Sequence, residues 1–311
     1  MVGDRVKSLR SGVPEPAKRQ IKETLRAVRT VTSPVRVLPD FLIIGAMKSG
    51  TTSLFRWLGD HPAFSMPAVK EPDFFSHDDR WAGGLSDYAA LFESAPSTQL
   101  TGEASTSYTY ERSFVTAPRI ASTLPSVKLV YVVRDPSERV RSHYRHEVQR
   151  GRETRPFVEA AGDLSSSYFA RSLYWERVLP YTEAFAREQL CIVRFEDLVS
   201  DEAPAWDVVL RFLDVEHRAR PDARHNVTAD KPQFTSVLTR ALKRKRLGWV
   251  RHLPRPARRI GRAVLTRDNP EYRAQLAASF DEPLPGAAAE KLAADANELA
   301  VWLRRSTPLW P

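Results

Sequence analysis

The chain has 311 residues, of which 42% are hydrophobic and 27% charged, with a net charge of +9 and a single cysteine. These values are typical of a globular protein with a sizeable core, and one cysteine excludes an internal disulfide. No apolar run approaches the roughly 18 residues of a transmembrane helix, and the charged N-terminus lacks the apolar core of a signal peptide.

A basic N-terminal extension is expected over residues 1–39, followed by a single domain over residues 40–311. The domain begins with the apolar strand Phe41–Ile44. A glycine loop follows, and then a helix is predicted from Thr51 to about Gly59. Such a strand–loop–helix presents backbone N–H groups and the positive end of a helix to an anion, most often a phosphate.

The glycine loop differs from an ordinary nucleotide-binding loop at one position. Gly45 and Gly50 have the spacing of the Walker A pattern, but the residue after Gly50 is Thr51, where an ATPase or GTPase has lysine. The lysine comes earlier, at Lys48. The sequence therefore predicts a loop that holds a phosphate-like group without being an ordinary nucleoside triphosphatase. A simple turn before an unremarkable helix is the alternative.

The stretch 63–82 is expected to be an irregular loop. It carries Lys70 and Glu71, followed by the pair Phe74–Phe75, which we expect to anchor the loop in the core. On these residues alone, Glu71 is interpreted as a surface glutamate beside a lysine.

A second buried strand, Lys128–Val133, ends directly at Arg134. Arg134 is therefore expected at the carboxyl edge of the sheet, where open α/β sheets bind ligands. Asp135 and Pro136 are typical of an N-cap and a first helical residue. Ser142 follows two turns into that helix, so an arginine and a hydroxyl can together hold a second phosphate.

Strands and helices alternate along the chain. The further predicted elements are strands at 99–102 and 190–193 and helices at 85–92, 114–124, 137–149, 167–187, 205–213 and 287–305. This alternation predicts an α/β fold with three layers, a central parallel sheet with helices on both faces. Cys191 falls inside a strand and is interpreted as a core residue, and no cysteine or histidine cluster has metal-ligand spacing.

The region 219–270 is irregular, proline-rich and basic. Within it, residues 236–267 hold eleven Lys and Arg and no acidic residue, so removing them from the net charge of +9 leaves −2 for the rest. Such a run is typical of a solvated helix face, of a segment that closes over an anionic donor or acceptor, or of a surface for membranes or nucleic acid.

Four motifs in this order resemble the sulfotransferases that use 3′-phosphoadenosine 5′-phosphosulfate, and the heparan-sulfate-type branch with its bacterial members is the most similar. The motifs are Lys48–Ser53, Lys70–Phe75, Arg134 with Ser142, and Arg171–Tyr174. The resemblance implies the P-loop-like sulfotransferase fold and an enzyme that moves a sulfuryl group to a hydroxyl or amine. It also implies 3′-phosphoadenosine 5′-phosphate as the second product and no metal.

The resemblance assigns a role to each matching residue. Glu71 would be the general base, and Lys48 would act at the bridging oxygen of the donor. The donor-binding residues would be Lys48, Ser49, Gly50, Thr51, Thr52, Ser53, Arg134, Ser142 and Tyr174. His143 and His146 remain alternative bases, while Glu103, after a strand, is expected to face the cleft or to form a salt bridge.

The chain departs from the family pattern in two places. Ala104 stands where glycan-modifying relatives carry lysine, and the basic glycine-containing loop near their C-terminus is not found. The donor assignment is unaffected, and the acceptor stays open among carbohydrates, glycolipids and hydroxylated natural products. The lack of an anchor implies a cytoplasmic bacterial member, and no nucleic-acid partner is expected.

Two other classes of function are weighed against a sulfotransferase. A nucleotide kinase with a P-loop would need a magnesium site and a lysine after Gly50, and neither is found. A non-enzymatic module that binds nucleic acid or membranes through residues 236–267 would leave the agreement of Lys48, Glu71 and Arg134 with three motifs unexplained.

Overall fold

The computed structural model describes residues 37–221, 277, 279 and 282–310. These residues form two compact units, one made of residues 37–134 and 174–221 and the other of residues 135–173, 277, 279 and 282–310. The extension up to residue 36 and the basic run 236–267 lie outside the described residues. The single domain expected over residues 40–311 stays a prediction.

The first unit contains a five-stranded parallel sheet in the order β2-β3-β1-β4-β5. Its strands are β1 (Phe41–Gly45), β2 (Phe64–Ser65), β3 (Leu100–Ala104), β4 (Lys128–Val133) and β5 (Leu190–Arg194). All five residues of β1 are buried, as expected for a strand with helices on both sides. Because β3 and β4 flank β1, the segments that follow these three strands emerge beside one another.

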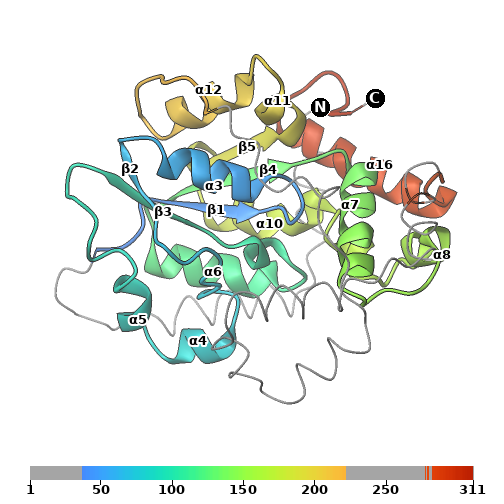
Figure 1. Ribbon diagram of the computed structural model, residues 1–311, viewed down its shortest axis with the longest axis horizontal. Helices are drawn as coiled ribbons and strands as arrows, with labels where there is room; N and C mark the ends of the chain where they lie inside the picture. The colour runs from blue at the N-terminus through green and yellow to red at the C-terminus, as the bar shows by residue number, and fades with distance from the viewer. Residues whose placement is uncertain (1–36, 222–276, 278, 280–281, 311) are drawn as a thin grey trace, which may run out of the picture. The chain divides into compact units, whose positions relative to one another are not determined.

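Helices cover both faces of this sheet (Figure 1). On one face lie α3 (Thr51–Gly59), α11 (Phe195–Val199) and α12 (Pro204–Phe212), and on the other lie α6 (Ser113–Thr123) and α10 (Tyr174–Ala184). Trp57 of α3 and Trp206 of α12 meet edge to face at 6.5 Å within the apolar core of the first face. The predicted three-layer α/β fold is confirmed.

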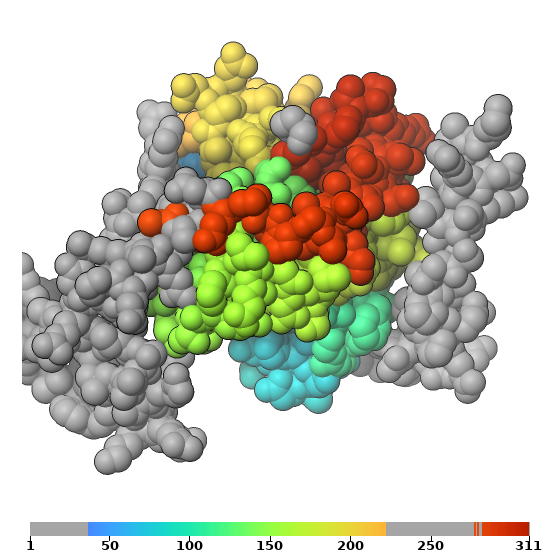
Figure 2. Space-filling model, turned by 90° about the vertical axis from the view of Figure 1, so that its right-hand side faces the viewer, coloured from blue at the N-terminus to red at the C-terminus, as the bar shows by residue number. Residues whose placement is uncertain are grey.

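The second unit is helical in its described part. It contains α7 (Pro136–Gln149), α8 (Phe157–Gly162), α9 (Ser167–Ala170) and α16 (Gly286–Trp302). These helices share a core of Val140, Tyr144, Phe157, Tyr168 and Leu292, among others. Figure 2 shows α16 in red beside the green chain of α7 and α8, which it contacts.

Two sequence predictions were wrong in detail. The loop expected over residues 63–82 contains β2 and the short helix α4 (Asp78–Ala82). The single helix expected over residues 167–187 is interrupted, so that α9 and α10 are separate.

Buried hydrogen bonds explain the interruption after α9. The Ser172 hydroxyl donates to the Tyr168 carbonyl at 2.9 Å and accepts a bond from the Arg139 guanidinium at 3.1 Å. Both Ser172 and Arg139 are fully buried. The turn between α9 and α10 thus places a hydroxyl and a carbonyl acceptor beside the buried Arg139 guanidinium.

Candidate active site

The phosphate-type loop follows β1 and is held against its neighbours at the carboxyl edge of the sheet. The Ala46 N–H donates to the Val132 carbonyl of β4 at 2.7 Å. Gly45 has φ +153°, and a Cβ there would lie 2.2 Å from the Thr109 hydroxyl oxygen, so no larger residue fits. Lys48 has φ +71°, a left-handed conformation that a residue with a Cβ rarely adopts. Strain of this kind is concentrated at functional sites.

The loop leaves one polar atom without a protein partner. Ser49 is fully buried, and its hydroxyl oxygen has no hydrogen-bond partner among the described residues. Ser53 and Leu54 donate their N–H groups to the Gly50 carbonyl, at 2.9 and 3.1 Å. The N–H groups that precede them in the first turn of α3 therefore point out of the helix end, next to Ser49 in sequence. A phosphate oxygen is the ligand that an orphaned hydroxyl and a helix N-terminus both favour.

The hydroxyl residues that follow Gly50 form the first turn of α3. Thr51 and Ser53 are buried, whereas Thr52 is half-buried. Gly50 has φ +84°, and a Cβ there would come within 2.6 Å of the Phe195 ring. The backbone of the loop therefore packs directly on Phe195.

Phe195 also contacts Arg134, the arginine at the end of β4. The Arg134 guanidinium lies over the Phe195 ring, 5.0 Å from its centre. The Arg134 backbone N–H donates to the hydroxyl oxygen of the fully buried Tyr174 at 3.3 Å. One aromatic ring thus joins Gly50 to Arg134, and Tyr174 fixes the backbone at Arg134. The sequence analysis missed Phe195, although its position directly after a parallel strand was a signal.

Glu71 lies in a tight turn attached to the carboxyl end of β3. Its backbone N–H donates to the Ala104 carbonyl at 3.0 Å. One carboxylate oxygen of Glu71 accepts bonds from the Thr106 backbone and hydroxyl, both at 3.1 Å, and the other pairs with the Lys70 ammonium. The side chain is 35% exposed, so the carboxylate is held in place yet open to solvent. Glu71 has φ +63°, which again indicates a strained functional turn.

A chain of side-chain contacts connects Glu71 to the phosphate-type loop. The Thr106 hydroxyl, which donates to this carboxylate, lies 3.2 Å from the Tyr110 hydroxyl. The Tyr110 oxygen in turn lies 3.2 Å from the Met47 sulfur. Met47 directly precedes Lys48 in the loop. The structure thereby brings the predicted base and the predicted phosphate loop into one site in the first unit.

Among the described residues Glu103 has no cationic partner, so the expected salt bridge is not found there, and its full burial rules out the expected place facing a cleft. Glu103 is fully buried within β3, and its carboxyl accepts hydrogen bonds from Tyr108 at 2.6 Å, Tyr88 at 3.3 Å and Ser105 at 2.9 Å. Burial raises the pKa of the Glu103 carboxyl to about 7, although these three hydrogen bonds oppose the change.

The remaining predicted residues lie in the second unit, on α7. Asp135 caps this helix, accepting the Glu138 N–H at 2.8 Å, as predicted. Ser142 is 8% exposed. His143 is 2% exposed, and its Nδ1 lies 2.6 Å from the Arg139 guanidinium, which favours a neutral acceptor histidine within the core. His146 lies in the last turn of α7 and is half-buried. Of these histidines, His143 is poorly placed to be a base.

In the described ranges, no group of three His, Cys, Asp or Glu side chains is arranged to hold a metal ion. Cys191 is buried in β5, and burial raises the pKa of its thiol to about 12, so it is a core residue. No helix in the part of the chain that the structure describes is long and apolar enough to cross a membrane.

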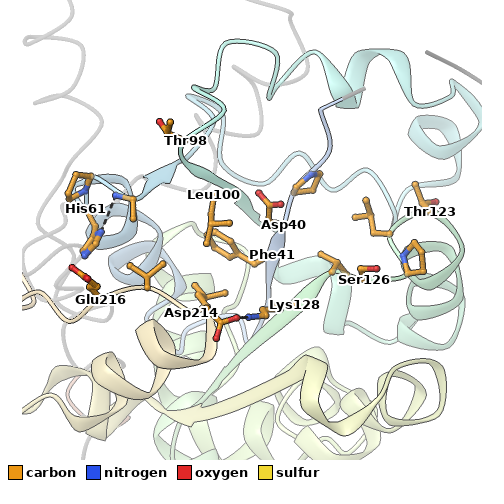
Figure 3. Close-up of a pocket in the computed structure, with 18 residues that line it drawn as sticks. Asp40, Phe41, His61, Thr98, Leu100, Thr123, Ser126, Lys128, Asp214 and Glu216 are labelled. Carbon is orange, nitrogen blue, oxygen red and sulfur yellow. Dashed lines mark hydrogen bonds and ion pairs between the residues drawn. The ribbon is translucent and has the colours of Figure 1, made fainter. Parts of the chain in front are cut away.

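A pocket of about 830 Å³ opens at the other edge of the sheet, where the strands begin (Figure 3). Several of its charged side chains are already paired. Lys128 bonds to the Asp214 carboxylate and to the Phe212 carbonyl, the latter at 2.7 Å. Asp40 accepts two bonds from Thr101, at 2.7 and 3.1 Å. These interactions stabilise the start of the sheet, and we assign no ligand to the pocket.

A family model described as the sulfotransferase domain matches residues 38–246 of the 311. The chain therefore belongs to the sulfotransferase domain family. The match includes β1, its loop, the Glu71 turn and Arg134, so the elements that form the candidate site are those that the family shares.

Particular relatives are similar over part of the chain. Heparan sulfate glucosamine 3-O-sulfotransferase 5 of Mus musculus is 31% identical over 199 residues, which are 59% of this chain and 56% of that protein. The membrane-associated sulfotransferase kil1 of Dictyostelium discoideum is 37% identical over 138 residues, which are 43% of this chain and 28% of that protein. The chain thus spans about half or less of these relatives' lengths. The cytoplasmic, bacterial origin expected from the sequence stays a prediction.

Among solved structures, a sulfotransferase from Alicyclobacillus acidocaldarius has a TM-score of 0.59 and 25% sequence identity. The similarity covers 87% of this chain and 98% of that one. The architecture of the sheet and its helices is therefore that of a sulfotransferase fold.

Proposed function

We propose that the chain transfers a sulfuryl group from 3′-phosphoadenosine 5′-phosphosulfate to a hydroxyl or amine of a carbohydrate or similar acceptor. The observation that carries the proposal is the buried, orphaned Ser49 hydroxyl next to the N-terminus of α3, in a loop whose Met47 is connected by side-chain contacts to the Glu71 carboxylate. A phosphate-binding loop beside a general base is what in-line transfer from an anhydride requires. The donor supplies an activated sulfonate on a phosphate leaving group.

The loop residues bind and neutralise the leaving phosphate. Lys48 places a compact positive charge at the loop, and the Ser49 hydroxyl with the first amides of α3 donates to phosphate oxygens. Such donors are strongest when they face the charge that develops as the bond breaks. The hydroxyls of Thr51, Thr52 and Ser53 complete this set.

Arg134 would bind the 3′-phosphate. A guanidinium can bind two phosphate oxygens at once, and the contact with the Phe195 ring at 5.0 Å helps to position it. This role would explain how the site selects its donor over ATP, which has no 3′-phosphate. Tyr174 would act through the Arg134 backbone, because its hydroxyl already accepts that N–H.

Glu71 would remove the proton from the acceptor. Its carboxylate oxygen is aligned by two donors from Thr106 and remains open to solvent, as a base that meets an external acceptor must be. The relatives include one named as a heparan sulfate glucosamine 3-O-sulfotransferase and another named as a heparan sulfate N-deacetylase/N-sulfotransferase. Both hydroxyl and amine acceptors on glycans are therefore worth testing.

The donor assignment has a direct binding test. We expect 3′-phosphoadenosine 5′-phosphate at 100 times its dissociation constant to stabilise the protein by about 2.7 kcal/mol, seen as a rise of roughly 5 °C in melting temperature. AMP and ATP should give much smaller shifts, because they cannot use a 3′-phosphate site. Thermal melts with each nucleotide measure this preference.

Arg134→Ala is the matching variant. It should remove most of the preference for the 3′-phosphorylated nucleotide, whereas Arg211→Ala, at an exposed position on α12, should keep it. Equal shifts with AMP and the bisphosphate in the unaltered protein would end the case for this donor.

A further inference from the structure

The buried carboxyl group of Glu103 has no part in the mechanism proposed above. Glu103 lies at the end of β3, and its neighbour Gly102 faces the other side of the sheet, where a Cβ would be 2.2 Å from the Phe41 ring. The Glu103 side chain is therefore directed to the face that carries Tyr88 and Tyr108, both of which donate to it. A carboxyl that is fully buried and bonded to three hydroxyl groups requires a structural or functional reason.

One of these hydroxyls joins Glu103 to the Glu71 turn. The Ser105 hydroxyl donates to Glu103 at 2.9 Å and accepts the Asp73 backbone N–H at 3.0 Å. A serine hydroxyl has a single proton, so donation to Glu103 directs a lone pair towards Asp73. The turn needs such support, because Glu71 and Asp73 both have positive φ, +63° and +51°.

Two further hydrogen bonds hold the same turn. The Ser107 hydroxyl donates to the Asp73 carboxylate at 2.6 Å, and the Glu71 N–H bonds to the Ala104 carbonyl at 3.0 Å. Four consecutive residues after Glu103 thus contact the turn through Ala104, Ser105, Thr106 and Ser107. Of these contacts, the one through Ser105 depends on the state of the Glu103 carboxyl.

We infer that Glu103 is a positioning residue, which in its carboxylate form holds the Glu71 turn in its working conformation through the Ser105 hydroxyl. The inference rests on the proposed role of Glu71 as general base. It adds to that role a proton-dependent control, since protonation of Glu103 would reorient the hydroxyl on which the turn depends.

The groups around Glu103 determine the pH range in which its carboxyl gains or loses a proton. The titratable groups that face it are Asp73 in the turn, Tyr88 of α5 (Ser86–Ala89), Tyr108 of the 3-10 helix η2 (Thr106–Thr109) and Tyr181 of α10. The tyrosines stay protonated near neutral pH, because burial raises the pKa of all three phenols. Burial also raises the pKa of Asp73.

Protonation changes the hydrogen-bond balance around Glu103. As a carboxylate it accepts from three hydroxyls, whereas the neutral acid must itself donate, so one of the three donors has to turn away. With a pKa of about 7 for Glu103, the arrangement that supports the Glu71 turn forms as the pH rises through neutrality.

The contribution of Glu103 to the free energy of unfolding falls as the pH rises, whereas the support of the Glu71 turn grows. Its pKa rises on folding from 4.5 to about 7, so the folded protein holds this proton more tightly than the unfolded chain does. Glu103 therefore stabilises the fold at low pH, and this stabilisation is lost as the pH rises through about 7. This stabilisation declines between about pH 4.5 and 7, so its loss is completed at about the pH where the turn becomes aligned.

Amide hydrogen exchange of the whole protein tests the inference without an acceptor. In Glu103→Gln and in Ser105→Ala, the amide of Asp73, corrected for its intrinsic rate, should exchange roughly tenfold faster at pH 8, as expected when one hydrogen bond is lost, and the amide of Glu71 in the same turn should follow it. Ser113→Ala removes another buried hydroxyl of the first unit and should leave these amides unchanged. The two single changes should not add in the double variant, because both act through Ser105.

The pH dependence gives the second measurement. In the unaltered protein, the amides of Glu71 and Asp73 should become more protected as the pH rises through 7, whereas in Glu103→Gln their protection should not depend on pH. With a heparan sulfate oligosaccharide as acceptor, turnover of the unaltered protein should fall on the acidic side of pH 7, and in Glu103→Gln this fall should disappear. The affinity of the variant for 3′-phosphoadenosine 5′-phosphate should stay within about twofold of the unaltered value. Unchanged protection in both variants would overturn the inference. Exchange that changes as expected, without turnover on any acceptor, would uphold the positioning role and count against the proposed function instead.

Discussion

Replacing Glu71 with glutamine is expected to lower turnover by roughly 10²–10⁴, the range for loss of a general base. Glutamine keeps the length and shape of the side chain, and its oxygen can still accept the Thr106 bonds that hold Glu71. What is lost is the capacity to take a proton. Donor binding should change little, since the phosphate-type loop and Arg134 are untouched. Turnover at saturating donor and acceptor and the bisphosphate melting shift measure the two effects separately.

The control for this variant is Glu93→Gln, at an exposed position of the same unit. It should leave turnover unchanged. Near-normal turnover of Glu71→Gln with saturating acceptor would move the base elsewhere. His146 would then be tested first, because His143 is buried against a guanidinium and is poorly placed for the role.

The parts of the fold that depend on local sequence were predictable. The strand before the loop, the helix from Thr51 and the strand Lys128–Val133 agree with the structure to within a residue, because apolar runs, glycines and capping residues act over a few positions. The capping role of Asp135 followed from the same local chemistry. The sequence therefore predicted correctly which strands and helices carry the residues at the carboxyl edge of the sheet.

The contacts that complete the site were not predictable from spacing. Thr106 meets Glu71 from 35 positions away in the chain, and Phe195 reaches Gly50 across a much longer separation. Both contacts depend on strand order, because β1 lies between β3 and β4. The expectation for Glu103 failed for another reason. A charged residue near a strand end predicts a cleft or an ion pair, but the partners of Glu103 are three hydroxyl donors, of which Ser105 and Tyr108 follow the strand and Tyr88 comes from α5.

Backbone strain was also invisible to the sequence. Lys48, Glu71 and Asp73 are non-glycine residues with positive φ, where local propensity would place glycine or asparagine. All three lie in the two segments that the motifs assign to chemistry. Conflict between local preference and the folded conformation is expected at sites selected for function rather than stability.

Replacing Lys48 with glycine should have opposite effects on turnover and on stability. Removing the ammonium should lower turnover by roughly 10²–10³, the range for loss of one preorganised group that stabilises the transition state. Glycine adopts positive φ without the penalty of about 1–2 kcal/mol that a residue with a Cβ meets in the left-handed region. The melting temperature of the free protein should therefore not fall, and we expect it to rise by a few degrees.

Lys48→Ala is the matched control, because it removes the same charge and keeps the Cβ at φ +71°. The two variants should lose turnover equally, whereas only the glycine variant should gain in melting temperature. A glycine variant that melts well below the alanine variant would show that the lysine backbone is not strained in solution. Turnover close to that of the unaltered protein in both would remove Lys48 from the chemistry, and the helix N-terminus and Ser49 would then have to hold the leaving phosphate without it.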